Sequence, residues 1–124
     1  AAERDPLYLH ALRNRFLRTP NVTVAPLDPS NPEHFQPWHD SFETALCMNV
    51  LEYVEQPEIV VRSLAQALKP DGLIVLLVPQ GRSLFGSVDR TLGHLRRFSR
   101  GDVARMLEAE GFGGECVYQF NRIG

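Results

Sequence analysis

The sequence predicts an α/β sandwich built on a mostly parallel central sheet. Segments with a helical spacing of apolar residues alternate with short β-prone segments along the chain. Two of the β-prone segments, Thr44–Met48 and Leu73–Val78, are apolar almost without interruption. Such runs are typical of parallel strands buried on both faces, because the connecting helices cover both sides of the sheet.

Length and composition indicate one domain that spans residues 1–124. The chain is 44% hydrophobic and 23% charged, with a formal net charge of −2, which is ordinary for a globular domain. Its longest aliphatic run, Leu73–Val78, is far shorter than the roughly 20 residues of a membrane-spanning helix. No basic and apolar leader opens the chain, and Cys47, Cys116 and the four histidines lack metal-ligand spacing. We therefore expect a cytoplasmic protein with two buried thiols, no membrane span and no metal site.

A capped helix and a short strand are predicted at the start of the chain. Asp5–Pro6 is typical of a helix start, because Asp accepts bonds from free N–H groups and Pro tolerates the first helical position. The pattern predicts this helix over 6–18 and a strand over Val22–Ala25. Residues 29–41 contain three prolines, so we expect a loop with one short helical turn at Pro32.

The second half continues the alternation. We expect a helix over 57–68, an irregular segment over 80–98, a helix from Ser99 or Arg100 to about residue 110, and a last strand over Cys116–Phe120. The turn Lys69–Gly72 leads into the strand Leu73–Val78, with Gly72 expected to supply a positive φ. Gly111 is expected to end the last helix as a left-handed cap.

Charge is unevenly distributed along the chain. Residues 19–61 contain seven acids and no Lys or Arg, whereas residues 82–105 contain six arginines and two acids. Two solvated faces would explain this pattern, and so would an anion-recognising segment around Arg96–Arg97. The arginines could equally pair with a local acid such as Asp89. Nucleic acid is not an expected partner, because the overall charge is negative and aromatic residues do not alternate with basic ones.

Polar residues follow the predicted strands. In parallel α/β sheets, ligands bind beyond the carboxyl ends of the strands, which selects Asp28, the segment Asn49–Glu52 and Gln80 onward. Asp28 could bind a ligand or start a turn with Pro29. Asn49 could simply form a turn, and Glu52 could act as a base or favour a helix start. The residues alone leave these alternatives open.

The stretch Gly93–Phe98 adds a second kind of candidate. His94 can act as an acid or a base near neutral pH. Arg96 and Arg97 can bind a carboxylate or phosphate through paired N–H groups. A solvated loop is the alternative interpretation of the same residues.

Four stretches together resemble a class I S-adenosylmethionine-dependent methyltransferase domain: Ala45–Val54, Leu68–Pro79, Leu84–Ser99 and Ala109–Phe112. The third is similar to a bacterial type-11/12-like subgroup with a GH-x-RR-aromatic stretch, sometimes joined to glycosyltransferase modules. The resemblance implies a Rossmann-like sandwich, S-adenosyl-L-methionine as cofactor, and methyl transfer to a small-molecule acceptor or one linked to a glycan or lipid. It also leaves a homo-oligomer or a fused glycosyltransferase module as possible partners.

The resemblance implies roles for individual residues. The implied cofactor contacts are Glu3, Asp28, Pro29, Asn49, Val50 and Leu51. Among them, Glu3 falls where the family holds the ribose hydroxyls, and Asp28 falls beside the adenine. Asn49 and the backbone of Val50 and Leu51 fall beside the methionine part and the acceptor. Arg96 and Arg97 fall in the segment that covers the acceptor, and are implied to bind it.

Two residues are candidates to remove a proton from the acceptor. His94 lies in the covering segment, and Tyr53 stands where related sequences often have His. Methyl transfer depends chiefly on orientation and on exclusion of water, so a fixed base is not obligatory. If a proton must leave the acceptor, we expect His94 or Tyr53 to take it.

The sequence also departs from the family pattern. The family has a Gly-rich turn after its first strand, and none precedes Glu3, while Gly111–Gly114 follows a helix instead. The family's last strand has no counterpart before Gly124. We therefore expect an incomplete methyltransferase domain, poorly stable alone or completed by further residues or a second copy. A non-catalytic α/β binding or interaction module is the alternative function.

Overall fold

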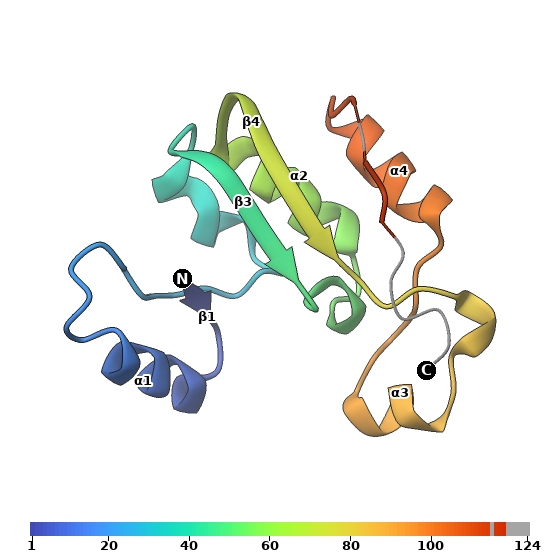
Figure 1. Cartoon of the computed structure of the whole chain (residues 1–124), viewed down its shortest axis with the longest axis horizontal. Coiled ribbons are helices and arrows are strands. Elements are labelled where there is room, and N and C mark those ends of the chain that lie inside the picture. Colours follow the sequence, from blue (N-terminus) through green and yellow to red (C-terminus); the bar gives the residue numbers. More distant parts are fainter. Residues whose placement is uncertain (115, 119–124) are drawn as a thin grey trace.

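The computed structural model describes residues 1–114 and 116–118, in which helices and strands alternate as predicted (Figure 1). The strands are β1 (Ala2–Glu3), β2 (Ala25–Pro26), β3 (Phe42–Met48) and β4 (Leu68–Leu77). The α-helices are α1 (Pro6–Arg15), α2 (Pro57–Ala67), α3 (Ser87–Leu92) and α4 (Arg100–Ala109). Short 3-10 helices occur at η1 (Pro32–Trp38), η2 (Leu51–Tyr53) and η3 (Arg82–Leu84). The predicted α/β class is confirmed.

The strands form two parallel pairs. β1 pairs with β2, and β3 pairs with β4 in a register that runs from Thr44 opposite Leu73 to Met48 opposite Leu77. Parallel neighbours need a crossover connection; α1 lies in the first crossover and α2 in the second. Within residues 1–114 and 116–118, no strand joins the two pairs into one sheet.

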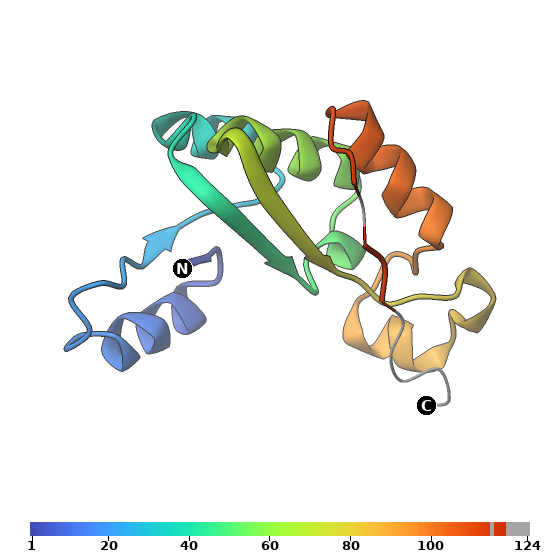
Figure 2. The ribbon, with the colours of Figure 1, turned by 45° about the horizontal axis from the view of Figure 1, so that its top comes forward.

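The core lies on one side of the β3–β4 pair. Helices η1 and α2 cover this face, and α4 packs against α2 (Figure 2). The buried core cluster consists of Cys47, Leu51, Val54, Val60, Val61, Phe98 and Met106. These side chains come from β3, η2, α2, the segment before α4, and α4 itself. The core therefore anchors the segment that follows the carboxyl end of β3.

The opposite face of the β3–β4 pair corrects a prediction. Both strands were expected to be covered on two faces, but Leu46, Met48 and Leu73 are 65%, 54% and 59% exposed. Side chains alternate between the two faces of a strand, and η1 and α2 lie on the other one (Figure 2). The apolar runs reflect strands suited to double burial, but the described residues bury only one face.

Several element boundaries also differ from the predictions. The second strand is Ala25–Pro26 rather than Val22–Ala25, because Val22 N–H closes a turn onto the Thr19 carbonyl. The segment 80–98 is not wholly irregular, since it contains α3. Of the strand predicted over Cys116–Phe120, residues 116–118 have no regular secondary structure, and 119–120 lie outside the described residues.

Gly111 and Gly72 are required for different reasons, one for its backbone angle and the other for lack of space. Gly111 has a φ of 83° directly after α4, which confirms the predicted left-handed cap. The predicted turn Lys69–Gly72 lies inside β4, however, and the positive φ there belongs to Asp71 (63°) and not to Gly72. Gly72 is needed for space instead, because a Cβ there would lie 2.8 Å from the Lys69 carbonyl oxygen.

We therefore expect Gly72→Ala to destabilise the protein. The added methyl group would push the Gly72 and Lys69 backbone apart, and overpacking of this kind typically lowers the free energy of unfolding by about 1–3 kcal/mol. Gly113→Ala is the matched control, because a Cβ at Gly113 meets nothing within 4 Å. Urea unfolding of both variants tests this, and equal stabilities would contradict it.

Candidate functional site

The carboxyl ends of the strands carry the residues selected from the sequence. Glu3 ends β1, Asp28 follows β2, Asn49 follows β3 and Gln80 follows β4. A groove of about 950 Å³ opens between the β1–β2 pair and β3. It is lined by residues of β1, the turn after β2, β3, η2 and α2, among them Glu3, Pro29, Asn49, Val50 and Tyr53. We call it the strand-end groove.

Glu3 is fixed at one end of the strand-end groove. Its Oε1 accepts hydrogen bonds from the backbone N–H groups of Arg4 and Asp5, at 2.8 and 2.9 Å. These bonds hold the carboxylate at the end of β1, just before α1 begins. A carboxylate in this position can accept hydrogen bonds from ligand hydroxyl groups.

Asp28 lies in a turn after β2, and its predicted contact with the cofactor stays a prediction. Its Oδ1 accepts from Ser30 N–H at 2.9 Å, and its carbonyl accepts from Asn31 N–H at 3.1 Å. This is the turn that Asp-Pro was also predicted to start. Pro29 lines the strand-end groove, whereas Asp28 is not among its lining residues.

The segment after β3 makes a sharp turn. Asn49 has a φ of 52°, a left-handed conformation that Asn tolerates better than most residues. Its N–H donates to the Leu77 carbonyl at 2.9 Å, which ties the turn to the end of β4. Val50 lines the groove together with Asn49. Leu51 is fully buried in the core, so it anchors the turn rather than presenting its side chain to a ligand.

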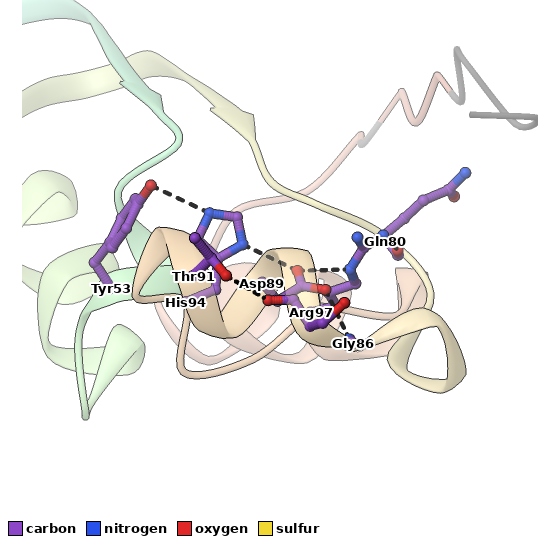
Figure 3. Close-up of polar contacts among 8 residues, drawn as sticks. Tyr53, Gln80, Gly86, Asp89, Thr91, His94 and Arg97 are labelled. Atoms are coloured by element: carbon purple, nitrogen blue, oxygen red, sulfur yellow. Dashed lines mark hydrogen bonds and ion pairs between the residues drawn. The ribbon is translucent and has the colours of Figure 1, made fainter.

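Tyr53, His94 and Asp89 form a continuous hydrogen-bonded chain (Figure 3). The Tyr53 hydroxyl lies 3.1 Å from His94 Nε2, and His94 Nδ1 lies 3.0 Å from Asp89 Oδ1. The two rings meet edge to face, with centroids 4.9 Å apart. Tyr53 lines the strand-end groove, so the chain leads from the groove to a buried carboxylate. The structure thus brings together the two residues predicted as proton acceptors.

Asp89 organises this chain from the third residue of α3. Its Oδ2 accepts from Gly86 N–H at 2.9 Å, and its Oδ1 accepts from Arg97 Nε at 2.8 Å (Figure 3). The Arg97 guanidinium, followed by the Gly86 amide, holds the pKa of Asp89 well below its usual range. The side chain is 1% exposed, so it is a buried carboxylate, and its lowered pKa keeps it ionised near neutral pH.

The charge on Asp89 decides the direction of the hydrogen bonds. An ionised carboxylate only accepts, so His94 Nδ1 must donate to it. In the neutral ring, Nε2 is then an acceptor, and the Tyr53 hydroxyl donates to it. A proton can therefore pass from Tyr53 to His94, and the resulting imidazolium is stabilised by Asp89.

The sequence did not identify Asp89 as a functional residue. The sequence indicates Asp89 only as a local partner for the arginines, and its contact with Arg97 confirms that pairing. The available signal was an acid three residues after Gly86, where a helix begins. That pattern indicates a cap, but nothing in it indicates that His94 folds back onto the same carboxylate.

Glu52 is a buried acid beside this chain. Its side chain is almost completely buried, and burial raises its pKa, while the nearby His94 opposes the shift. Its backbone carbonyl accepts from Leu95 N–H at 2.7 Å, which ties η2 to the segment after α3. The backbone of Glu52 therefore helps to hold Tyr53 and His94 next to each other.

Arg96 and Arg97 are directed away from the strand-end groove. Arg97 contacts Asp89 and donates to the Gln80 carbonyl at 3.3 Å. Arg96 donates to the Glu55 carbonyl at 2.8 Å. Both line a second cavity and neither lines the strand-end groove. Their predicted contact with an acceptor stays a prediction.

One of the two cysteines is buried and the other is exposed. Cys47 is buried as expected, and burial raises its pKa to about 11. Cys116 is exposed, contrary to expectation, because residues 116–118 pair with no strand. Across the described ranges, no three His, Cys, Asp or Glu side chains are placed to share a metal ion. No helix in these ranges is both long and apolar enough to cross a bilayer.

Comparisons with known proteins agree with this architecture. The chain is 21% identical to the CMeT domain of the citrinin polyketide synthase (TM-score 0.76), and the match covers 91% of this chain and 32% of that one. The trans-methyltransferase CalH in complex with SAH gives 22% identity and a TM-score of 0.70, covering 90% and 35%. The [4+2]-cyclase SpnF is 19% identical with a TM-score of 0.67, and the match covers 89% of this chain and 41% of that one. This chain thus spans a third to two fifths of these structures.

These likenesses define the class as a Rossmann-like class I methyltransferase fold. A family model described as a methyltransferase domain matches residues 5–117. The chain therefore belongs to the methyltransferase-domain family, as the four resembling stretches predicted. No relative was found among curated proteins.

The lowered pKa of Asp89 predicts that the protein loses stability in acid. Because its pKa is lowered by folding, its contribution is complete above the ordinary Asp pKa and is lost as the pH falls toward the lowered value. Wild-type stability should fall between about pH 5 and about pH 2, and Asp89→Asn should show a smaller fall over that range. Urea unfolding across these pH values measures both slopes; equal slopes would count against the assignment.

Proposed function

We propose that this chain forms the cofactor and proton-transfer site of an S-adenosylmethionine-dependent methyltransferase. The observation that carries the proposal is the Tyr53–His94–Asp89 chain, which opens into a groove that follows β3 and reaches the carboxyl ends of β1 and β3. Ligands of α/β sheets bind in this position. Membership of the methyltransferase-domain family supports the assignment.

The groove suits the proposed cofactor. It has a fixed carboxylate at Glu3 for hydroxyl groups, and the turn at Asn49 and Val50 lines it at the end of β3. We propose that Glu3, Pro29, Asn49 and Val50 hold S-adenosyl-L-methionine, with Leu51 supporting the turn from the core. The bound cofactor would supply an electrophilic methyl group.

Tyr53 and His94 would handle the proton of the acceptor. Tyr53 is 40% exposed, so its hydroxyl is accessible to an acceptor in the groove. As the acceptor loses a proton to the Tyr53 oxygen, the hydroxyl proton of Tyr53 passes to His94 Nε2. Asp89 holds His94 in the required orientation and stabilises its charged form.

This arrangement favours acceptors that must lose a proton. Sugar hydroxyls, phenols and acidic carbon atoms are of this kind, and they are consistent with a small-molecule or glycan-type acceptor. A non-catalytic binding module would need no proton acceptor in its groove. The ordered chain from Tyr53 to Asp89 therefore favours an enzyme over that alternative.

Removing the proton acceptor should slow methyl transfer without affecting cofactor binding. We expect His94→Asn to lower the rate by about 10²–10⁴-fold with hydroxyl and carbon acceptors, because general-base catalysis contributes that much. Tyr53→Phe should lower it as well, since the relay loses its first hydroxyl. Formation of S-adenosylhomocysteine with a panel of phenols, sugars and 1,3-dicarbonyl compounds measures the rates.

The matched controls are His39→Asn and Tyr118→Phe, whose side chains are exposed and do not line the strand-end groove. Both should retain the wild-type rate. Wild-type turnover by His94→Asn would show that the relay has no part in catalysis. Cofactor binding with no turnover by the wild type would support the non-catalytic module.

The cofactor assignment has a separate test. Calorimetric titration with S-adenosylhomocysteine should show saturable binding, weakened about tenfold by Glu3→Gln, because hydrogen bonds to a charged group are lost. Glu33→Gln, in the first turn of η1 and outside the groove lining, should bind like the wild type. Equal affinities for the two variants would remove Glu3 from the site.

A further inference from the structure

A second cavity lies between α2, α4 and the segment 82–98. It measures about 610 Å³, and we call it the arginine groove. Within residues 1–114 and 116–118, five arginines line it: Arg62, Arg82, Arg96, Arg97 and Arg105. Its apolar wall includes Phe85, Phe98 and Met106. The cavity therefore combines several positive charges with an apolar surface.

Two of the five arginines are neutralised by their own acids. Arg62 Nε lies 3.0 Å from Glu110 Oε1, and Arg97 Nε lies 2.8 Å from the buried Asp89. These pairs shape the wall of the cavity. They leave no excess charge to attract a ligand.

In the part of the chain that the structure describes, Arg82 and Arg105 share a single carboxylate, that of Asp102. Arg82 Nε donates to Asp102 Oδ2 at 2.9 Å, and an Arg105 terminal nitrogen donates to Asp102 Oδ1 at 2.6 Å. Asp102 is nearly buried and also caps α4 through the Ser99 backbone N–H. The two arginine side chains are 68% and 70% exposed. One carboxylate cannot neutralise two guanidinium groups, so one positive charge remains accessible.

Arg96 supplies a second uncompensated charge. Its Nη2 donates to the Glu55 carbonyl, and no carboxylate pairs with it among residues 1–114 and 116–118. Its Nε is enclosed and has no hydrogen-bond partner in the same part of the chain. A buried charged donor without a partner is destabilising. Among the described residues, Glu58 is the one remaining acid that lines the cavity, and it is exposed on the first turn of α2.

We propose that the arginine groove binds a phosphate monoester that carries an apolar substituent. A phosphate monoester has a charge of about −1.5 to −2 near neutral pH and three acceptor oxygens. It could therefore compensate Arg96 and the Arg82–Arg105 pair together, which a single carboxylate could not. Phe85, Phe98 and Met106 would contact the substituent. The proposal is independent of methyl transfer, because these residues do not line the strand-end groove.

Calorimetric titration of the whole chain with hexyl phosphate at low ionic strength tests the proposal. We expect saturable binding of one molecule per chain. Inorganic phosphate should bind more weakly because it lacks the apolar part, and hexanoate should bind more weakly because it is a monoanion. Arg105→Gln and Arg96→Gln should each weaken hexyl phosphate binding about tenfold.

Arg13→Gln is the matched control, because it removes the same charge from the exposed surface of α1, outside the groove lining. It should bind hexyl phosphate like the wild type. The Arg105 side chain is mostly exposed, so Arg105→Gln keeps the test valid even if Arg96→Gln unfolds. Absence of saturable binding, equal binding of hexanoate, or an equal loss in Arg13→Gln would each overturn the proposal.

Discussion

The buried carboxylate of Asp89 is the interaction on which the candidate site depends. It receives hydrogen bonds from the Gly86 amide, the His94 ring and the Arg97 guanidinium, and it is 1% exposed. Low polarity strengthens each of these bonds and makes the loss of any partner costly. The single carboxylate thus starts α3, orients His94 toward Tyr53 and fixes Arg97.

The segment after β4 connects the two cavities through this carboxylate. In this segment, the His94 side chain contacts Tyr53 at the strand-end groove, whereas Arg96 and Arg97 line the arginine groove. The core residue Phe98 follows directly and carries the chain into α4, with its backbone bonded to Pro79 and Gly81. A short stretch of sequence therefore supports the proposed proton transfer on one side and the proposed anion site on the other.

Patterns within single segments predicted much of this structure. Asp5–Pro6, Pro57 and Gly111 marked helix ends correctly, because caps depend on residues that are close in sequence. The helix over 87–92 was missed, since its start depends on Gly86 and on Asp89, whose burial requires the contact with Arg97 after the helix. The exposed face of β3 and β4 was missed for a related reason. Apolar residues indicate that a strand face can be buried, but they do not show whether another element covers it.

The sequence by itself determined the α/β class and the position of most elements, and it selected Tyr53 and His94 as candidate proton acceptors. Tertiary structure decided which of the chosen residues meet. It joined Tyr53 to His94 across 41 positions of sequence, kept Asp28 in a turn, and placed Arg96 and Arg97 in a separate cavity. The physical reason is that helix caps and strands arise from neighbours in the chain, whereas a hydrogen-bonded site arises from burial that brings distant residues together.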